Sequence, residues 1–365
     1  MTATLFDPIQ LGDYYLKNRV FMAPMTRART GPAGIPDELV AIYYAQRASA
    51  GLVISEATAV HPRGDGWPGA PGIYTDEQQA GWAAVADAVH AEGGRIFMQI
   101  WHMGRAALSE SIEGQKPLAP SPVAATGEIP NSKGVPTAFD TPEAMSAAQI
   151  REAVSAFATA ARRAIDAGLD GVEIHAANNF LIDAFLRDGS NRRSDEYGGS
   201  VENRSRFLLE VVDAVTAEIG AGKVGVRFSP TNAVFGISDA NPEAIFTYAA
   251  RQLSRRNLAY LHVLEPALDS GSPMSAGLPL LAPALRESYD GLMILNGSLT
   301  QQTGQRALTS DAADAIAFGV PFISNPDLVE RFRNNIALSK PNPDTFYGGG
   351  AEGYTDYPAK ELESA

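Results

Sequence analysis

Eight short apolar segments, most of them followed by a longer segment with helical periodicity, constrain this fold more than any other sequence feature. Such an alternation predicts parallel strands joined by crossover helices. The clearest helical segment is residues 147–167, where Ile150, Phe157 and Ala161 share one helical face. Residues 201–219 and 328–337 have a similar pattern. The predicted strands are residues 19–23, 52–58, 95–101, 171–175, 224–228, 260–264, 292–296 and 313–318.

Eight strand–helix units within about 300 residues favour an α/β protein with one closed (β/α)8 barrel, a TIM barrel. An open doubly wound sheet is the alternative. Residues 102–145, rich in Pro, Ser and Gly, interrupt the alternation after the third strand. They have too few apolar residues for a core of their own, so we expect an excursion over the barrel. No shift in composition marks a boundary, and residues 1–365 are therefore predicted to form a single domain.

Composition and charge exclude several classes of function. The formal net charge is −13, which argues against binding to nucleic acid or to anionic membranes. The chain has no cysteine, so disulfides, thiolate nucleophiles and iron–sulfur clusters are excluded. Neither a signal-peptide pattern nor an apolar stretch of about 20 residues is visible. We expect a cytoplasmic enzyme, monomeric or dimeric, that acts on a small molecule.

The chemistry of a (β/α)8 barrel lies at the carboxyl ends of its strands. The seventh and eighth predicted strands end beside Gly297 and Gly319, where a phosphate usually binds in this fold. Other strand ends carry neutral hydrogen-bonding groups and one cation: Thr26, Gln99, His175, Asn178 and Arg227. Together these groups suit a flat, hydrogen-bonding heterocycle with a phosphate tail, which favours flavin mononucleotide (FMN).

Other interpretations of these strand ends stay open. A metal-dependent hydrolase is one, a flavin-free lyase is another, and a flavoprotein that binds ligands with little turnover is a third. A Schiff-base aldolase is not favoured, because none of the six lysines ends a predicted strand. The side chains that could ligate a metal are Glu56, His102, His175 and Glu265, of which His102 is better explained as structural.

Several blocks of the sequence resemble, in the same order, the Old Yellow Enzyme family. The resemblance extends from Leu5 to Pro358 and is strongest to short bacterial ene-reductases such as N-ethylmaleimide reductase and xenobiotic reductase. It implies an FMN-containing barrel that uses NADPH or NADH to reduce activated alkenes, such as enones, maleimides and nitroalkenes. The matching blocks are residues 23–27, 44–48, 99–105, 194–200, 324–328 and 353–358.

The resemblance also implies contacts with the cofactor. Thr26 would hydrogen-bond flavin O4, and Arg227 would face N1 and O2, where negative charge collects on reduction. Many relatives have Arg at the position of Val320, so we expect weaker retention of the phosphate here. The ring would contact Ala23, Pro24, Met25, Ala57 and Gln99, and the phosphate would contact Gly297, Ser298, Gly319 and Val320.

His175 and Asn178 resemble the pair of donors that binds the substrate oxygen in this family. Two donors three residues apart can polarise one carbonyl or nitro oxygen while hydride from flavin N5 reaches the β-carbon. The alternative is that His175 is a buried histidine with satisfied hydrogen bonds and that Asn178 caps a helix. Trp67, Trp101 and Tyr347 are expected to line the substrate cavity.

Asn179 and Phe180 depart from the family pattern, which has Gly and Tyr at these positions. The Tyr is the family's proton donor to the α-carbon, and Phe180 has no hydroxyl. We expect Asn179 to alter the local backbone and to fill space above the flavin. The adjacent departures suggest an engineered variant, with a divergent natural enzyme as the alternative. The missing phenol also leaves open radical or desaturase chemistry.

Overall fold

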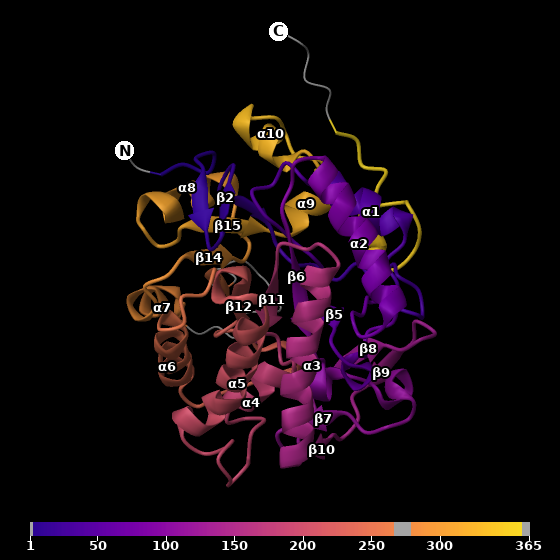
Figure 1. The fold of residues 1–365 in the computed structure, drawn as a ribbon, viewed down its shortest axis with the longest axis vertical. Coiled ribbons are helices and arrows are strands. Elements are labelled where there is room, and N and C mark those ends of the chain that lie inside the picture. The colour runs from indigo at the N-terminus through magenta and orange to yellow at the C-terminus, as the bar shows by residue number, and fades with distance from the viewer. Residues whose placement is uncertain (1–2, 266–278, 360–365) are drawn as a thin grey trace.

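The computed structural model describes residues 3–265 and 279–359, and it contains a closed barrel of parallel strands (Figure 1). The ring closes where β11 pairs with β6, so the predicted (β/α)8 barrel is confirmed and the open sheet is wrong. The strands of the barrel are β3 (Val20–Met22), β4 (Val53–Ile54), β6 (Ile96–Trp101), β11 (Gly171–His175), β12 (Val224–Phe228), β13 (Tyr260–Leu264), β14 (Met293–Asn296) and β15 (Ala315–Phe318).

The second predicted strand, residues 52–58, is split in the structure. Within this segment, only β4 and the short β5 (Thr58–Ala59) form strands, and both pair with β6. The backbone between them leaves the sheet where the Glu56 carboxylate accepts hydrogen bonds from the backbone N–H groups of Arg27 and Ala28. The last predicted strand is also shorter than expected, because β15 begins at Ala315 rather than at residue 313.

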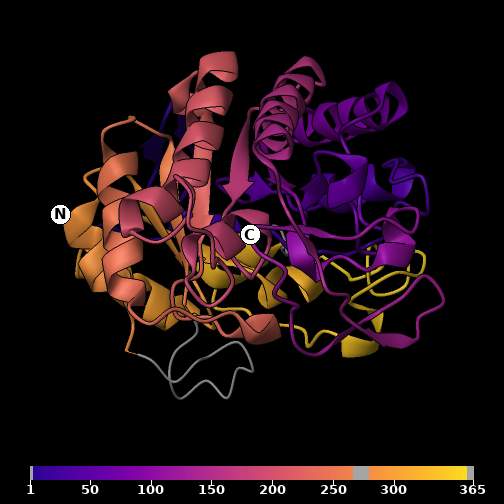
Figure 2. The same cartoon turned by 90° about the horizontal axis from the view of Figure 1, so that it is seen from below.

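Helices surround the barrel, and the chain colours follow one another around it (Figure 2). Helix α3 begins with a capping box of Ser146 and Gln149, and it buries the predicted face. No helix within residues 3–265 and 279–359 has the length and hydropathy of a membrane span. The helices are α1 (Glu38–Ala45), α2 (Asp76–Ala91), α3 (Ala147–Asp166), α4 (Leu181–Leu186), α5 (Val201–Ile219), α6 (Pro242–Ser254), α7 (Ala282–Ser288), α8 (Gln301–Thr309), α9 (Val320–Ser324) and α10 (Leu328–Arg333).

Helix α10 ends at Arg333, although the periodicity of the sequence predicted a helix to residue 337. Asn335 takes a left-handed conformation with φ 53°, which ends the helix. The backbone N–H of Ile336 then bonds back to the Arg331 carbonyl. Short 3₁₀ helices occur at η1 (Pro62–Gly64), η2 (Gly104–Ala106), η3 (Ser109–Ile112), η4 (Ala221–Lys223), η5 (Val234–Gly236) and η6 (Pro343–Thr345).

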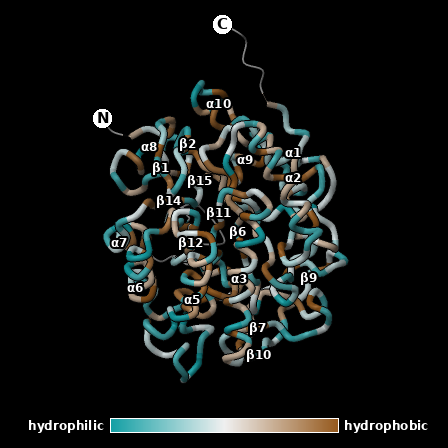
Figure 3. Tube along the Cα trace, in the orientation of Figure 1, coloured by the Kyte–Doolittle hydropathy of each residue, from teal (hydrophilic) through white to brown (hydrophobic). Residues whose placement is uncertain are grey.

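The barrel interior is apolar at the amino-terminal ends of the strands, and this end of the barrel is closed. The hairpin of β1 (Ile9–Leu11) and β2 (Tyr14–Leu16) packs against the same buried cluster as Phe21, Ile54 and Phe97. Hydrophilic segments gather along the outer loops (Figure 3). Because this end is sealed, the open end of the barrel lies at the carboxyl ends of the strands, where the predicted site residues are.

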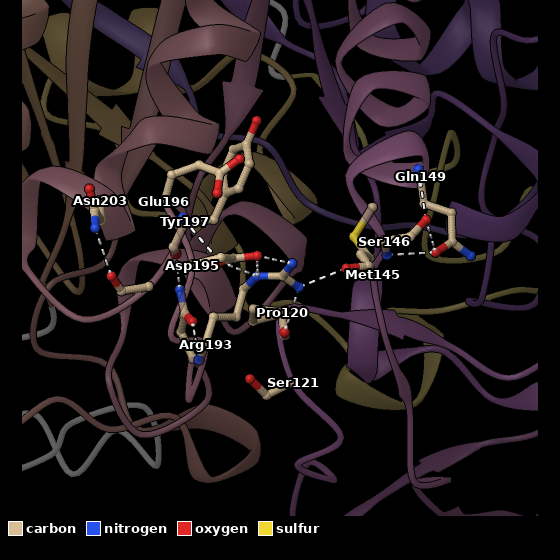
Figure 4. A network of polar contacts seen from close by, with 12 residues as sticks. Pro120, Ser121, Met145, Ser146, Gln149, Arg193, Asp195, Glu196, Tyr197 and Asn203 are labelled. Atoms are coloured by element: carbon tan, nitrogen blue, oxygen red, sulfur yellow. Dashed lines mark hydrogen bonds and ion pairs between the residues drawn. The ribbon is translucent and has the colours of Figure 1, made fainter.

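Residues 102–145 form the predicted excursion, and a polar network attaches it to the body of the barrel (Figure 4). The Arg193 guanidinium donates to the backbone carbonyls of Pro120 (3.0 Å) and Met145 (2.7 Å) and pairs with Asp195. The short strands of the excursion are β7 (Leu118–Ala119), β8 (Glu128–Pro130), β9 (Pro136–Ala138) and β10 (Glu143–Ala144). Its inner residues pack with Trp101 beside the open end of the barrel.

Candidate active site

All of the site residues predicted from the sequence line a single cavity at the carboxyl ends of the barrel strands. The cavity has a volume of about 580 Å³, within the usual range for sites that hold cofactors and small ligands. The predicted residues in its wall are Ala23, Pro24, Met25, Thr26, Ala57, Trp67, Gln99, Trp101, His175, Asn178, Phe180, Arg227, Gly297, Ser298, Gly319, Val320 and Tyr347.

The cation expected beside the flavin, Arg227, is buried in the cavity floor. Its Nη2 donates to Asn296 Oδ1 at 2.8 Å, and Asn296 Nδ2 in turn donates to the Ala317 carbonyl. The buried Nε of Arg227 has no hydrogen-bond partner among the described residues. Asn296 was not predicted as a site residue, although it ends the seventh strand directly before Gly297.

The end of the cavity where the sequence predicted a phosphate is built from small residues after strands β14 and β15. Gly297 has φ 133° and Ser298 has φ 53°. Such positive φ values favour glycine and give the backbone N–H groups directions that they do not have in a strand or a helix. Val320, at the start of α9, is 50% exposed and brings no charge. Among the described cavity-lining residues, Arg27 and Arg227 are the only arginines, and none is a lysine. The cradle and the unpartnered Arg227 Nε fit a flat heterocycle with an anionic tail.

His175 and Asn178 both line the cavity, and each has a hydrogen-bonding group without a partner among the described residues. Asn178 Oδ1 accepts a hydrogen bond from Asn232 Nδ2 at 2.6 Å, which leaves the Asn178 amide N–H groups available as donors. Burial, reinforced by the Arg227 charge, lowers the pKa of His175 well below its usual range, so the imidazole is neutral. Its buried Nδ1 has no partner among the described residues, unlike a histidine with satisfied hydrogen bonds. Asn178 is not a helix cap, because α4 begins after Phe180.

Asn179 does not fill space above the cofactor position, so that prediction was wrong. Its side chain is fully buried outside the cavity wall, where Oδ1 accepts from Arg105 Nε at 2.7 Å and Nδ2 donates to the Phe235 carbonyl. The residue has φ 68°, a conformation usual for glycine and tolerated by asparagine. Position 179 therefore has the backbone conformation expected for glycine, and the Asn179 side chain forms hydrogen bonds with buried groups outside the cavity.

Aromatic side chains form the part of the cavity wall where the substrate was expected to bind. Phe180 meets Trp101 edge-on with a ring-centroid distance of 4.6 Å, and it meets His175 at 4.8 Å. Trp67 and Tyr347 contact each other at 5.4 Å, and Tyr347 is 58% exposed at the rim. Other apolar lining residues were not predicted. Leu264 ends β13, a strand end that was not assigned to the site, and the rest lie in loops or short helices that lack a distinctive pattern: Val234, Phe235, Leu299 and Phe346.

The segment that carries Phe346 and Tyr347 is held by an arrangement that we call the C-terminal clamp, made by Arg27 and Arg29. Arg27 Nε donates to the Phe346 carbonyl and its Nη2 to the Gly353 carbonyl, both at 2.9 Å. Arg29 Nε donates to the Gly350 carbonyl at 3.1 Å. Because Arg27 follows Thr26 in the chain, the strand end expected to face the cofactor also fixes the part of the cavity wall that carries Phe346 and Tyr347.

The side chains weighed as metal ligands have other roles. Glu265 accepts backbone N–H groups of Leu281 and Ala282, and Glu56 accepts those of Arg27 and Ala28. His102 Nδ1 accepts from the Gly104 N–H, and burial lowers its pKa to about 3, which matches the expected structural role. In the described part of the chain, no group of three or more His, Asp or Glu side chains is arranged to hold a metal ion.

A barrel with small residues after its last two strands, a buried arginine and a pair of free donors is the arrangement expected of a flavin-dependent oxidoreductase. Residues 4–339 match the model of the NADH:flavin oxidoreductase / NADH oxidase family, and the chain belongs to that family. This membership confirms the predicted enzyme class, the FMN cofactor and the nicotinamide reductant.

Relatives and solved structures agree with this assignment over nearly the whole chain. The chain is 42% identical to the flavin oxidoreductase hxnT of Emericella nidulans, over 97% of each chain. It is 46% identical to an Old Yellow Enzyme homologue from Zymomonas mobilis, with a TM-score of 0.96 over 98% of this chain and 100% of that one. A morphinone reductase structure is 47% identical, with a TM-score of 0.94 over 99% and 97%. The resemblance to the Old Yellow Enzyme family is thereby confirmed.

Proposed function

We propose that the protein is an FMN-dependent alkene reductase that oxidises NADPH or NADH and reduces activated alkenes such as enones, maleimides and nitroalkenes. The observation that carries this proposal is the pair of uncommitted donors, His175 and Asn178, in the wall of the cofactor cavity. Relatives support it: one of 43% identity from Leishmania infantum is named a probable flavin mononucleotide-dependent alkene reductase. We further propose that residues 1–365 are one FMN-binding domain.

In this proposal the chain's own residues bind the cofactor and orient the substrate. Gly297, Ser298, Gly319 and Val320 hold the phosphate by backbone N–H groups, and Arg227 compensates negative charge at the pyrimidine edge. The ring is held by Ala23, Pro24, Met25, Thr26, Ala57 and Gln99. When bound, FMN supplies the hydride that the alkene receives at its β-carbon.

The substrate oxygen lies between the donors of His175 and Asn178, which stabilise the charge that develops on it. Both donors are neutral, so they withdraw electron density without transferring a proton themselves. Trp67, Trp101 and Tyr347 enclose the alkene. Because Phe180 carries no O–H, the α-carbon takes its proton from water that enters past the exposed rim or from another hydroxyl of the cavity.

The proposal is tested with purified protein to which FMN is added. We expect quenching of flavin fluorescence on binding, bleaching of the flavin absorbance by NADPH or NADH under anaerobic conditions, and reoxidation by cyclohexenone. A protein that takes up no FMN would refute the proposal. A protein that is bleached by the nicotinamide but not reoxidised by any activated alkene would be a ligand-binding flavoprotein instead.

Desaturase chemistry is a second candidate, motivated by the missing phenol at Phe180. A saturated ketone would lose its β-hydride to the bound cofactor and its α-proton to water, and oxygen would take up the two electrons to give hydrogen peroxide. Chromatography of such incubations, with free FMN as the control, distinguishes this activity from alkene reduction.

Replacing Phe180 by tyrosine is expected to restore a fixed proton donor beside His175 and Trp101. General acids contribute about 10²–10⁴-fold to proton transfer. We expect a small gain for cyclohexenone, where hydride transfer limits the rate, and a larger one for nitroalkenes, where α-protonation limits it. Rates, product stereochemistry and the solvent isotope effect should change together in the Phe180→Tyr variant. If all of them match the wild type, position 180 is only a cavity wall.

Replacing Arg227 by methionine is expected to lower the midpoint potential of the bound flavin, because a fixed positive charge that favours the reduced state is lost. The shift is about 30 mV for each tenfold loss in the preference for reduced flavin over oxidised flavin. Spectroscopic redox titration against a reference dye measures it. An unchanged potential in Arg227→Met would show that the guanidinium does not face the flavin.

A further inference from the structure

A layer of polar side chains lies inside the barrel between the apolar lower core and the cavity. Alternate residues of a strand point the same way, so Glu173 lies one layer below His175 on β11. Glu173 pairs in register with Gln99 on β6, whereas His175 pairs with Arg227 on β12. The Glu173 side chain is 0% exposed and does not line the cavity, and its role is unassigned by the proposed function.

Both carboxylate oxygens of Glu173 have a short contact. Gln99 Nε2 donates to Oε1 at 2.7 Å, and His262 Nδ1 lies 2.7 Å from Oε2. Gln99 itself lines the cavity, so the contact with Glu173 fixes the orientation of its amide there. Two buried nitrogen atoms around this layer, Arg227 Nε and His262 Nε2, have no partner among the described residues. The Tyr260 hydroxyl faces the Glu173 carboxylate, and burial together with that negative charge raises the pKa of Tyr260 well above its usual value.

The layer holds one charge of each sign. Burial raises the pKa of Glu173, but His262, Arg227 and Gln99 together outweigh it and hold that pKa below its usual value. Burial lowers the pKa of His262 despite the adjacent carboxylate. At neutral pH the ionised Glu173 therefore faces a neutral His262, and its charge is balanced by Arg227 in the layer above.

We propose that Glu173 is a positioning residue for the cofactor, which orients Gln99, offsets the charge of Arg227 and makes the midpoint potential of the bound flavin more negative. A buried negative charge disfavours the addition of electrons to a nearby ring, and low polarity around it strengthens this effect. Arg227 alone would stabilise the reduced state more strongly and weaken its tendency to give up hydride. Glu173 moderates that stabilisation. The inference rests on the cofactor placement given under the proposed function.

The test is the midpoint potential of the FMN-loaded Glu173→Gln variant. Glutamine can still accept from Gln99 and donate to His262, so the charge is removed while both contacts stay. We expect the preference for reduced over oxidised flavin to rise on the order of tenfold, which is roughly 30 mV to more positive potential for a two-electron couple. The direction is opposite to that expected for Arg227→Met. A purely structural role for Glu173 would leave the potential unmoved.

Asp170→Asn is the matched control. Asp170 is also a buried carboxylate, but it lies just before β11 at the sealed end of the barrel, where it contacts His90 and Arg95. Removing the charge of Asp170 should leave the midpoint potential of the bound flavin unchanged. The proposal is overturned if Glu173→Gln binds FMN with a wild-type potential, or if its shift is no larger than that of the control.

A second variant protects the test against misfolding. The double change Glu173→Met with His262→Leu removes the pair together and leaves neither partner buried alone. It should shift the potential in the same positive direction. If neither variant folds and retains FMN, Glu173 serves the stability of the barrel and the proposal fails. If the wild-type protein itself takes up no FMN, the proposed function fails instead.

Discussion

The variant in which alanine replaces both His175 and Asn178 is expected to lose at least about 10²-fold in kcat/KM for enone reduction. Each donor to a developing oxyanion is worth about 2–4 kcal/mol of transition-state stabilisation. The losses need not add, because both donors act on the same oxygen. The long-wavelength absorption band expected when a phenol binds over the flavin should also vanish, because the phenolate loses both of its donors. Steady-state kinetics and phenol titration measure the two effects.

Asn232 offers a graded control for this experiment. Its amide donates to Asn178 Oδ1 and so fixes which end of the Asn178 amide faces the cavity. Asn232→Ala should leave FMN binding intact and cause a smaller loss than the double variant, because the Asn178 amide can then rotate. Phenol binding and enone reduction that persist in the His175/Asn178 double variant would refute the assignment of these residues.

Replacing Arg27 by methionine is expected to lower the free energy of unfolding by about 3–5 kcal/mol, because it breaks a buried, charged hydrogen-bond network. Arg27 is 1% exposed, and its guanidinium bonds to the carbonyls of Phe346 and Gly353 and to the Tyr43 hydroxyl. The variant leaves these groups without their donor. Urea unfolding measures the effect as a lower midpoint with an unchanged slope. Limited proteolysis should then cleave the chain first within residues 345–353.

Arg162→Met is the control for the Arg27 variant. Arg162 forms an ion pair with Glu218, and both side chains are about half exposed. Exposed pairs contribute about 0–1 kcal/mol, so this variant should unfold almost as the wild type does. Equal urea midpoints for the Arg27 and Arg162 variants would show that the C-terminal clamp adds no stability.

The sequence predicted the barrel well because each strand and helix has its own periodic pattern. The bounds of β11, β12 and β13 match the predicted ranges, and those of α5 match as well. Errors arose where a tertiary contact decides the local backbone. Glu56 bends the chain after β4 by binding amide groups of another strand end, and the left-handed Asn335 ends α10. Neither effect leaves a periodic signal.

The candidate site shows the same division. Every predicted site residue lines the cavity, because strand ends converge in a barrel regardless of details. The side-chain direction of Asn179 was predicted wrongly, since its partners Arg105 and Phe235 are remote in the sequence. The C-terminal clamp was missed because the acceptors of Arg27 are backbone carbonyls, and any residue can supply a carbonyl.

The C-terminal clamp has a consequence for the order in which the protein matures. The bond between Arg27 and the Gly353 carbonyl joins positions 326 residues apart. A ribosome makes the first barrel strand early and residues 345–353 more than 300 residues later, at about 5–20 residues per second. The wall that carries Tyr347 therefore cannot close during most of translation. A nascent chain reaches a closed substrate cavity only as a late event, and ligand binding to stalled chains of increasing length would date that event.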